Sequence, residues 1–164
     1  MSEHKAEVVW DRNGADFLDK RYSRRHLLRF DGGLEIPASA SPSVVPTPMS
    51  DPAAVDPEEA FVAALASCHM LWFLALAAER GFRVDRYRDG ASGTVARYAA
   101  KRLAVTEVIL RPRVEFAAGA CPSQEALLAL HEAAHAHCFI ANSVTTEVRC
   151  EPVLTAPSID DPQA

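Results

Sequence analysis

The chain has 164 residues, about the length of one domain, which is enough to bury a hydrophobic core of its own. Its 49% hydrophobic and 24% charged residues exclude a fibrous or disordered protein. The net charge of −5, with no run of Lys and Arg, argues against a nucleic-acid partner. Residues 1–10 lack the pattern of a secretory signal, so we expect a cytoplasmic protein whose four cysteines form no structural disulfide framework.

The N-terminal third predicts a small antiparallel meander. Residues 6–10, 22–30 and 34–36 are strand-like, and Asp31-Gly32-Gly33 supplies a turn between the last two. Six prolines lie from Pro37 to Pro57, too many for a regular element. We expect this segment to form an ordered surface loop or a flap.

A long helix is predicted to follow this loop. Asp56 is a good N-cap, Pro57 suits the first helical position, and Glu59 completes a sequence typical of a capping box. Residues 60–78 are apolar nearly all round, and the helix is expected to end before Gly81.

This apolar stretch approaches the length of a membrane span. Ser67 and His69 interrupt its middle, alanine is abundant, and the flanking segments are typical of amphipathic strands. We therefore favour a core helix buried on all sides in a soluble protein, and we expect no contact with a membrane.

The second half of the chain continues with strands and one more helix. Residues 83–87, 92–98 and 105–116 are strand-like, and residues 143–154 predict a last strand before a frayed tail at 155–164. Cys121-Pro122-Ser123 opens the second helix, whose core-facing stripe is formed by Leu127, Leu130, Ala134 and Cys138. The order of elements predicts an α+β fold with a single domain at residues 1–154.

Two of the four cysteines stand on the predicted helices. Cys68 and Cys138, each taken alone, are typical of inert core cysteines. A cysteine that attacks a peroxide must be a thiolate, which apolar surroundings disfavour, so Cys68 needs a nearby cation. The helix dipole fades within the first turn, which leaves Arg24 and Arg25 on the second strand as candidates. Neighbouring strand residues face opposite ways, so only one of the two arginines can serve.

Two sequence motifs resemble one known family, that of osmotically inducible protein C and the organic hydroperoxide resistance proteins (OsmC/Ohr). The resemblance covers residues 6–154 and is strongest at two places. The first is Asp56-Pro57-Glu58-Glu59-Ala60-Phe61 with the later Ala66-Ser67-Cys68, and the second is Ala134-His135-x-x-Cys138-x-x-x-Asn142. These motifs stand in the family's order, about seventy residues apart.

The resemblance implies a role for each matching residue. Cys68 matches the peroxidatic cysteine, which becomes a sulfenic acid, and Cys138 matches the resolving cysteine, which closes a disulfide. Glu58 matches the glutamate that holds the thiolate-stabilising arginine, for which we choose Arg24, with Arg25 as the alternative. No metal and no cofactor is implied.

The same resemblance implies an enzyme of peroxiredoxin-like chemistry. It would reduce organic hydroperoxides, be re-reduced by a dithiol such as a lipoylated protein, and serve in oxidative stress defence. The implied fold has antiparallel strands wrapped around a long buried helix in an intertwined homodimer, with active sites at the subunit interface. Ten residues separate Glu58 from Cys68, about 15 Å on a straight helix, so the two cannot touch there. Either the helix breaks, or a long arginine spans the gap, or the two residues come from different subunits.

Some features depart from the family pattern or allow other interpretations. His69 and the proline-rich loop do not belong to the pattern, and His69 either tunes the thiolate or packs in the core. His131-Glu132-Ala133-Ala134-His135 is a literal H-E-x-x-H, the zinc-peptidase motif, but it lacks the usual extension and a third ligand, so a zinc metallohydrolase is an alternative that we do not favour.

The remaining histidines and cysteines can be interpreted without a catalytic role. We expect His131, His135 and His137 to lie on the helix surface or near the site, and Cys121 and Cys150 to be bystanders. A non-catalytic protein that binds an apolar ligand would keep the fold, but binding alone requires neither Cys68 nor Cys138.

Overall fold

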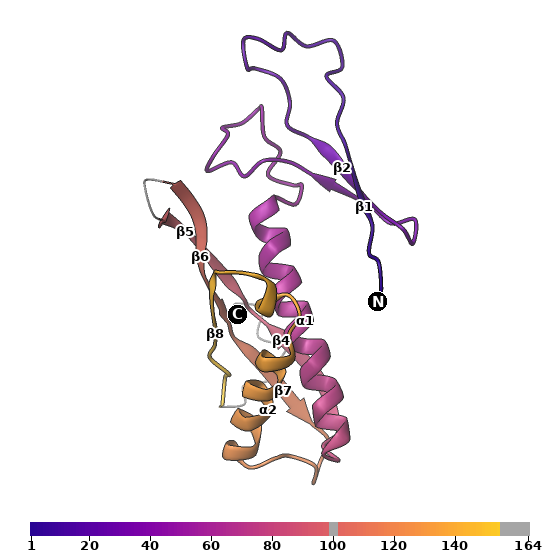
Figure 1. The fold of residues 1–164 in the computed structure, drawn as a ribbon, viewed down its shortest axis with the longest axis vertical. Coiled ribbons are helices and arrows are strands. Elements are labelled where there is room, and N and C mark those ends of the chain that lie inside the picture. The colour runs from indigo at the N-terminus through magenta and orange to yellow at the C-terminus, as the bar shows by residue number, and fades with distance from the viewer. Residues whose placement is uncertain (99–101, 155–164) are drawn as a thin grey trace. The chain divides into compact units, whose positions relative to one another are not determined.

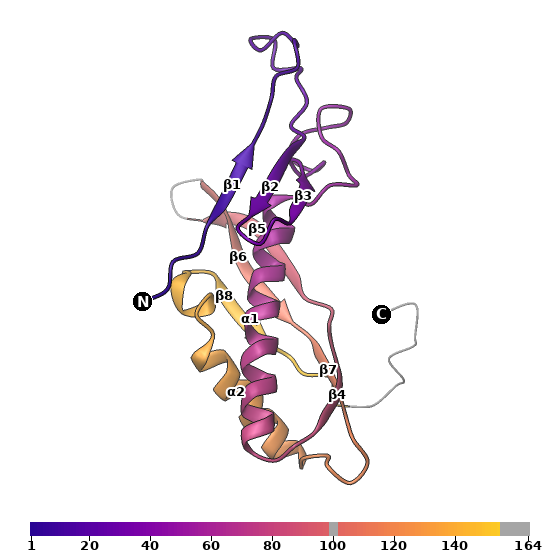
Figure 2. The same cartoon turned by 90° about the vertical axis from the view of Figure 1, so that its right-hand side faces the viewer.

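The computed structural model describes residues 1–98 and 102–154, and the predicted C-terminal tail lies outside them. The chain divides into two compact units, Met1–Ala60 and Phe61–Ala164, each described by itself. Figures 1 and 2 show the order of helices and strands along the chain. The predicted α+β class is confirmed, because helices and predominantly antiparallel strands occur together.

The first unit contains a three-stranded antiparallel meander, as predicted. β1 (Ala6–Val9), β2 (His26–Phe30) and β3 (Glu35–Ala38) pair in chain order. The predicted loop begins two residues too early, because Pro37 and Ala38 belong to β3. A proline is tolerated there since β3 is an edge strand of this sheet, where a missing N–H breaks no inner ladder.

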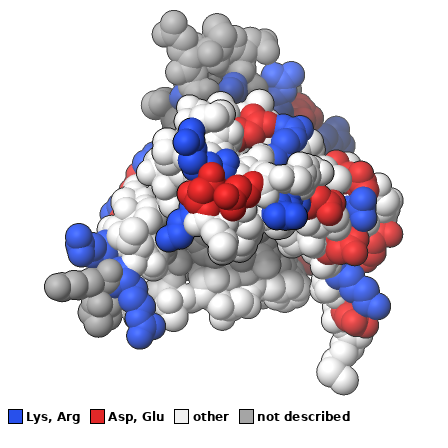
Figure 3. Space-filling model, turned by 90° about the horizontal axis from the view of Figure 1, so that it is seen from above, with Lys and Arg blue, Asp and Glu red and all other residues white. Residues whose placement is uncertain are grey.

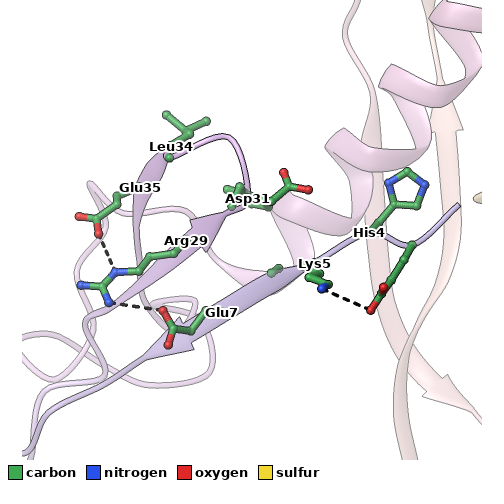
Figure 4. Close-up of a pocket in the computed structure, with 11 residues that line it drawn as sticks. His4, Lys5, Glu7, Arg29, Asp31, Leu34 and Glu35 are labelled. Carbon is green, nitrogen blue, oxygen red and sulfur yellow. Dashed lines mark hydrogen bonds and ion pairs between the residues drawn. The ribbon is translucent and has the colours of Figure 1, made fainter.

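The outer face of this meander carries exposed ion pairs. Arg29 on β2 bonds to Glu7 on β1 at 3.4 Å and to Glu35 on β3 at 2.6 Å, as Figure 4 shows. The three residues are direct cross-strand neighbours. A shallow hollow of about 760 Å³ lies beside them, and its lining contains no cysteine. Acidic and basic side chains are interspersed on the face drawn in Figure 3.

α1 (Pro57–Glu79) begins where the sequence predicts. The Asp56 side chain accepts a hydrogen bond from the backbone N–H of Glu59 at 2.8 Å, and the Glu59 side chain accepts one from the N–H of Asp56 at 3.1 Å. This is the predicted capping box. Gly81, with φ +80°, follows the last turn, a conformation that glycine adopts without a steric penalty.

α1 is not buried on all sides within one chain, which corrects the sequence expectation. Its fully buried residues recur every four positions and so form one stripe: Leu65, His69, Phe73 and Ala77. Leu71 is 60% exposed. By length and composition alone α1 could cross a membrane, with 22% of the apolar stretch buried in the chain, but the core helix of a soluble protein meets the same criterion.

The second unit adds two small sheets to this helix. β4 (Val84–Asp89) pairs with β7 (Pro112–Phe116), and β5 (Ser92–Tyr98), β6 (Arg102–Leu110) and β8 (Glu147–Cys150) form the other sheet. The pairs are antiparallel except β6 with β8, which is parallel. The single strand predicted at residues 105–116 is in fact two. Pro112 has no N–H to donate, and the N–H of Arg111 bonds to the Asp89 carboxylate at 2.7 Å instead of a ladder carbonyl.

α2 (Gln124–His137) packs beside α1, as both ribbon views show. Ser123 caps it by accepting a hydrogen bond from the N–H of Ala126 at 3.2 Å. The core cluster between the two helices is formed by Phe73, Ala77, Leu130 and Ala134. A second cluster joins Leu65 of α1 to Val108 and Leu110 of β6. A 3₁₀ turn at Ala141–Ser143 then leads into β8, so the last strand is shorter than predicted.

Candidate thiol site

The second unit brings the two predicted redox cysteines together. Cys68 is half-buried in the middle of α1, and Cys138 is the buried C-cap of α2. The two thiols are close enough for Cys68 to act on the protonation of Cys138. Both are free thiols seventy residues apart in sequence, so their pairing depends on the packing of α2 against α1.

Backbone N–H groups surround the sulfur of Cys138. The N–H of Ala141 donates to Cys138 Sγ at 3.4 Å, and the N–H of Ile140 also donates to it. The N–H of Asn142 closes this turn by donating to the Cys138 carbonyl at 3.0 Å. Burial, and then the hydrogen bond to Cys68, raise the pKa of Cys138 to about 11 in spite of these donors. Cys138 therefore keeps its proton at neutral pH and can donate it to the sulfur of Cys68.

Aromatic side chains flank the cysteine pair. Trp72 stands one turn after Cys68 on α1, on the same face of the helix. The ring of Trp72 lies 5.6 Å from the ring of Phe139, centroid to centroid, and 5.0 Å from that of His137. Phe139 follows Cys138 directly and is 68% exposed. An apolar molecule that reaches the thiols from this side would contact aromatic surface.

The two candidate arginines have different surroundings in the first unit. The guanidinium of Arg24 donates to the carbonyls of Lys20, at 2.7 Å, and Tyr22, and stacks 3.9 Å above the Tyr22 ring. It lines a largely apolar pocket of about 460 Å³ together with Trp10 and His26. Arg25 instead forms an ion pair with Asp51. The two side chains thus take different partners. Strand alternation is not the reason, because β2 begins at His26 and neither arginine lies on the strand predicted at residues 22–30.

The third predicted partner, Glu58, lies half-buried in the first turn of α1. Among residues 1–98 and 102–154, its carboxylate forms no hydrogen bond or ion pair, so the expected pair with an arginine is not formed within one chain. α1 runs unbroken from Pro57 to Glu79, which excludes a helix break between Glu58 and Cys68. Two explanations for this spacing remain: a long arginine spans the gap, or the two residues come from different subunits.

His69 and His131 form a second polar group in the core of the same unit. They are 1% and 2% exposed, and His69 Nε2 lies 3.0 Å from His131 Nδ1. Cys150 Sγ lies 3.6 Å from His69 Nε2. The expectation of a helix-surface position for His131 is therefore wrong, and Cys150, which we expect to be a bystander, contacts His69.

Burial controls the protonation of this group. It lowers the pKa of His69 to about 4, with His135 contributing, and that of His131 to about 3, with His69 contributing. Burial also raises the pKa of Cys150 to about 12, helped by the charges of Asp89 and Glu151. Both imidazoles and the thiol are thus neutral at physiological pH.

One sequence pattern could have predicted that these two histidines are buried. His69 continues the four-residue spacing of the buried stripe of α1, between Leu65 and Phe73. His131 follows Leu130 at the edge of the predicted stripe of α2. That Cys150 meets them depends on the parallel pairing of β8, which local patterns do not show.

The zinc-peptidase interpretation is not supported by the geometry. α2 is a helix, as H-E-x-x-H requires, and places His131 and His135 one turn apart. Within the described part of the chain, however, the metal-ligating atoms that converge belong to His69, His131 and Cys150. His135 is not among them.

The comparisons with known proteins agree with the fold. The chain is 51% identical to an OsmC-like protein of unknown function from Vibrio cholerae, with a TM-score of 0.91 over 93% of this chain and 100% of that one. An organic hydroperoxide resistance protein OsmC from Legionella pneumophila is 16% identical, with a TM-score of 0.69 over 94% and 98% of the two chains. The organic hydroperoxide resistance protein OhrB of Bacillus subtilis is 16% identical, with a TM-score of 0.65 over 93% and 98%.

No curated protein sequence matches the chain. The family model for OsmC-like proteins matches residues 50–152, which contain Glu58, Cys68 and Cys138. This match covers more than half of the chain and agrees with the near-complete overlap with the Vibrio cholerae structure. The chain therefore belongs to the OsmC-like protein family.

Proposed function

We propose that this protein is a thiol-dependent peroxidase that reduces organic hydroperoxides to alcohols. The observation that carries the proposal is the close approach of two free thiols, Cys68 on α1 and Cys138 at the end of α2. The overall reaction converts ROOH and a dithiol into ROH, water and a disulfide. It needs no metal or prosthetic group.

The first step is attack by the Cys68 thiolate on the distal oxygen of the hydroperoxide. The O–O bond breaks, the alkoxide takes up a proton and leaves as ROH, and Cys68 becomes a sulfenic acid. In the second step the Cys138 thiolate attacks the Cys68 sulfur, forms the disulfide and releases water. The closeness of the two thiols supports this step, because the second thiol is already near the sulfur that it attacks.

The electrostatics of the pair favour this division of roles. Cys138 is the more buried thiol and keeps its proton, so it stabilises a thiolate at Cys68 by hydrogen bonding. Besides burial, two effects of Cys68 raise the pKa of Cys138: hydrogen bonding to its sulfur and the negative charge of its thiolate. Oxidation of Cys68 to a neutral sulfenic acid weakens both, while the N–H donors of Ile140 and Ala141 remain. Cys138 then becomes easier to ionise when it is needed as the second nucleophile.

We assign the cation that stabilises the Cys68 thiolate to Arg24 and not to Arg25. Arg25 is already neutralised by Asp51, whereas the guanidinium of Arg24 bonds only to neutral carbonyls within the described residues and keeps its full charge. Glu58, whose carboxylate has no partner in the described part of the chain, is the group that would hold this arginine. Both assignments follow the family resemblance, which matches Glu58 directly.

An organic peroxide is the preferred substrate on chemical grounds. Trp72 and Phe139 offer apolar surface beside the thiols, which would bind an organic group but gain little from hydrogen peroxide. The relatives from Legionella pneumophila and Bacillus subtilis are named as organic hydroperoxide resistance proteins, which agrees with this choice. We place the protein in oxidative stress defence in the cytoplasm, with a dithiol such as a lipoylated protein as reductant.

A homodimer completes the proposal. α1 is apolar nearly all round, yet only one stripe of it is buried within the chain. A second copy would cover the remaining apolar face, including Leu71. It would also allow Glu58 and Cys68 of one site to come from different subunits.

Peroxide consumption by the purified, metal-free protein tests the proposal. With dithiothreitol or dihydrolipoamide, cumene hydroperoxide should be consumed much faster than hydrogen peroxide. Cys68→Ser should abolish turnover, because the serine hydroxyl is not ionised at neutral pH, whereas Cys121→Ser, which changes an exposed cysteine, should not. Absence of turnover with any dithiol would refute the peroxidase and favour the ligand-binding alternative.

A further inference from the structure

A buried polar cluster in the second unit is independent of the thiol pair. His69 on α1, His131 on α2 and Cys150 on β8 bring three ligand atoms within 4.8 Å of one another. His69 Nε2 is 3.0 Å from His131 Nδ1 and 3.6 Å from Cys150 Sγ. Three elements far apart in sequence thus converge on one point of the core.

The surroundings of this cluster contain several buried polar atoms without a hydrogen-bond partner in the described residues. Four such side-chain atoms belong to the two histidines and to neighbouring residues. They are His69 Nδ1, His131 Nε2, Tyr87 OH and Asp89 Oδ2. Tyr87 and Asp89 on β4 are close enough to act electrostatically on each other and on Cys150. None of these four is one of the three ligand atoms, so they mark this part of the core as unusually polar and do not themselves point to an ion.

The ligand types and spacings suit a metal ion better than a shared proton. Both His131 Nδ1 and Cys150 Sγ approach the same nitrogen, His69 Nε2, and a single proton serves only one of these contacts well. Zinc binds imidazole nitrogen and thiolate sulfur at about 2.0–2.3 Å, which places tetrahedral ligands about 3.3–3.6 Å apart. The separations of 3.0 Å and 3.6 Å from His69 Nε2 are close to these values, and all three ligand atoms lie within 4.8 Å of one another.

A small pocket gives access to the cluster. It has a volume of about 230 Å³, and its lining includes His131, Cys150, Glu132 and His135. An ion can enter by this route, and a water molecule in the pocket can complete the coordination. An open fourth position of this kind is typical of zinc sites that bind exchangeable ligands.

We propose that His69 Nε2, His131 Nδ1 and Cys150 Sγ form a zinc-binding site whose fourth position opens to this pocket. Binding replaces the proton of the Cys150 thiol, which passes to solvent as the zinc–sulfur bond forms. The site differs from the H-E-x-x-H arrangement, because it uses His131 without His135 and draws its sulfur ligand from β8.

Cobalt(II) is the probe that tests this site, because a cobalt–thiolate bond gives a charge-transfer absorption band and tetrahedral cobalt gives visible d–d bands. The protein carries Cys68→Ser and Cys138→Ser, so that the thiol pair cannot bind the ion. After treatment with a chelator, it should bind one Co²⁺ per chain, show both features, and lose them on addition of Zn²⁺.

Single substitutions in this background assign the ligands. Cys150→Ser should remove the charge-transfer band, and His69→Asn and His131→Asn should weaken Co²⁺ binding by about tenfold or more. Cys121→Ser and His135→Asn should leave the band intact. Circular dichroism and thermal unfolding check that each variant is folded, and Cys150→Ser, which nearly preserves volume, remains decisive if the histidine variants unfold.

Three results would overturn the site. These are the absence of stoichiometric Co²⁺ binding, a charge-transfer band that persists in Cys150→Ser, and loss of binding in His135→Asn while His69→Asn still binds. The last result would assign the metal to H-E-x-x-H. None of them affects the peroxidase, whose assay uses metal-free protein with Cys68 and Cys138 intact.

Discussion

Two adjacent arginines show how strongly local surroundings decide a residue's chemistry. Arg25 is 53% exposed and shares its charge with Asp51. Arg24 is held by the carbonyls of Lys20 and Tyr22 and by the face of the Tyr22 ring, and these fix its position without neutralising it. A fixed, uncompensated cation is what a peroxidatic thiolate requires.

Substitution of each arginine by methionine should therefore affect the rate of peroxide reduction differently. Arg24→Met removes the cation that stabilises the thiolate and should lower the rate of peroxide reduction by about 10²-fold, the usual effect of losing one electrostatic contact to a reacting charge. Arg25→Met removes an exposed ion pair and should leave the rate within about twofold. Stopped-flow measurement of thiol oxidation compares them, and equal losses would refute the assignment of Arg24.

The sequence could predict which residue types form the thiol site, but not all their partners. Cys68, Cys138 and Glu58 were identified from motifs. The structure brings the two cysteines near each other, and their redox roles stay predictions. His131 was misplaced because a histidine on a helix is usually solvated, and only its pairing with His69 makes burial tolerable. Such pairing across sixty-two residues has no local signature.

At the scale of elements, β5 packs unusually closely on α1. A Cβ atom at Gly93 would lie 2.7 Å from Cγ2 of Val62, closer than van der Waals contact allows. Glycine thus sets the distance between this strand and the helix that carries Cys68.

Gly93→Ala is expected to destabilise the protein by about 1–3 kcal/mol, because the branched Val62 side chain or the strand must shift. Gly90→Ala is the matched control, since its Cβ would meet no atom within 4 Å, and it should change stability by less than about 0.5 kcal/mol. Urea unfolding followed by circular dichroism measures both. Equal stability of the two variants would show that β5 does not pack on α1 as described.

Local chemistry was sufficient to predict most of these elements. The capping box placed the start of α1 within one residue, and the alternation of residues 92–98 gave β5 correctly. The errors occurred where nonlocal contacts decide. Pro112 divides a predicted strand because Asp89 bonds to the preceding N–H, and β8 is short because only residues 147–150 pair with β6.

For the whole molecule, the apolar surface of α1 is the main unexplained feature of a single chain. A helix of this composition gains most of its stability from burial, but only one stripe of it is covered. No sequence pattern distinguishes a helix covered by its own chain from one covered by a second copy, because both are apolar all round.

Leu71→Glu should therefore convert a dimer into a monomer, because it places a charge in the proposed interface. Leu34→Glu is matched in residue type and exposure, at 59% against 60% for Leu71, and should leave the dimer intact. Sedimentation analysis gives the mass of each. A wild-type protein that sediments as a monomer at all concentrations would contradict the dimer.

The central claim is that Cys68 and Cys138 act as one redox pair. The most direct measurement is peptide mapping by mass spectrometry after the reduced protein reacts with one equivalent of cumene hydroperoxide. We predict rapid loss of two hydrogen atoms per chain and a disulfide-linked peptide pair that contains Cys68 and Cys138. A stable sulfenic or sulfonic acid at Cys68 with Cys138 still free, or a disulfide to Cys121 or Cys150, would contradict the account.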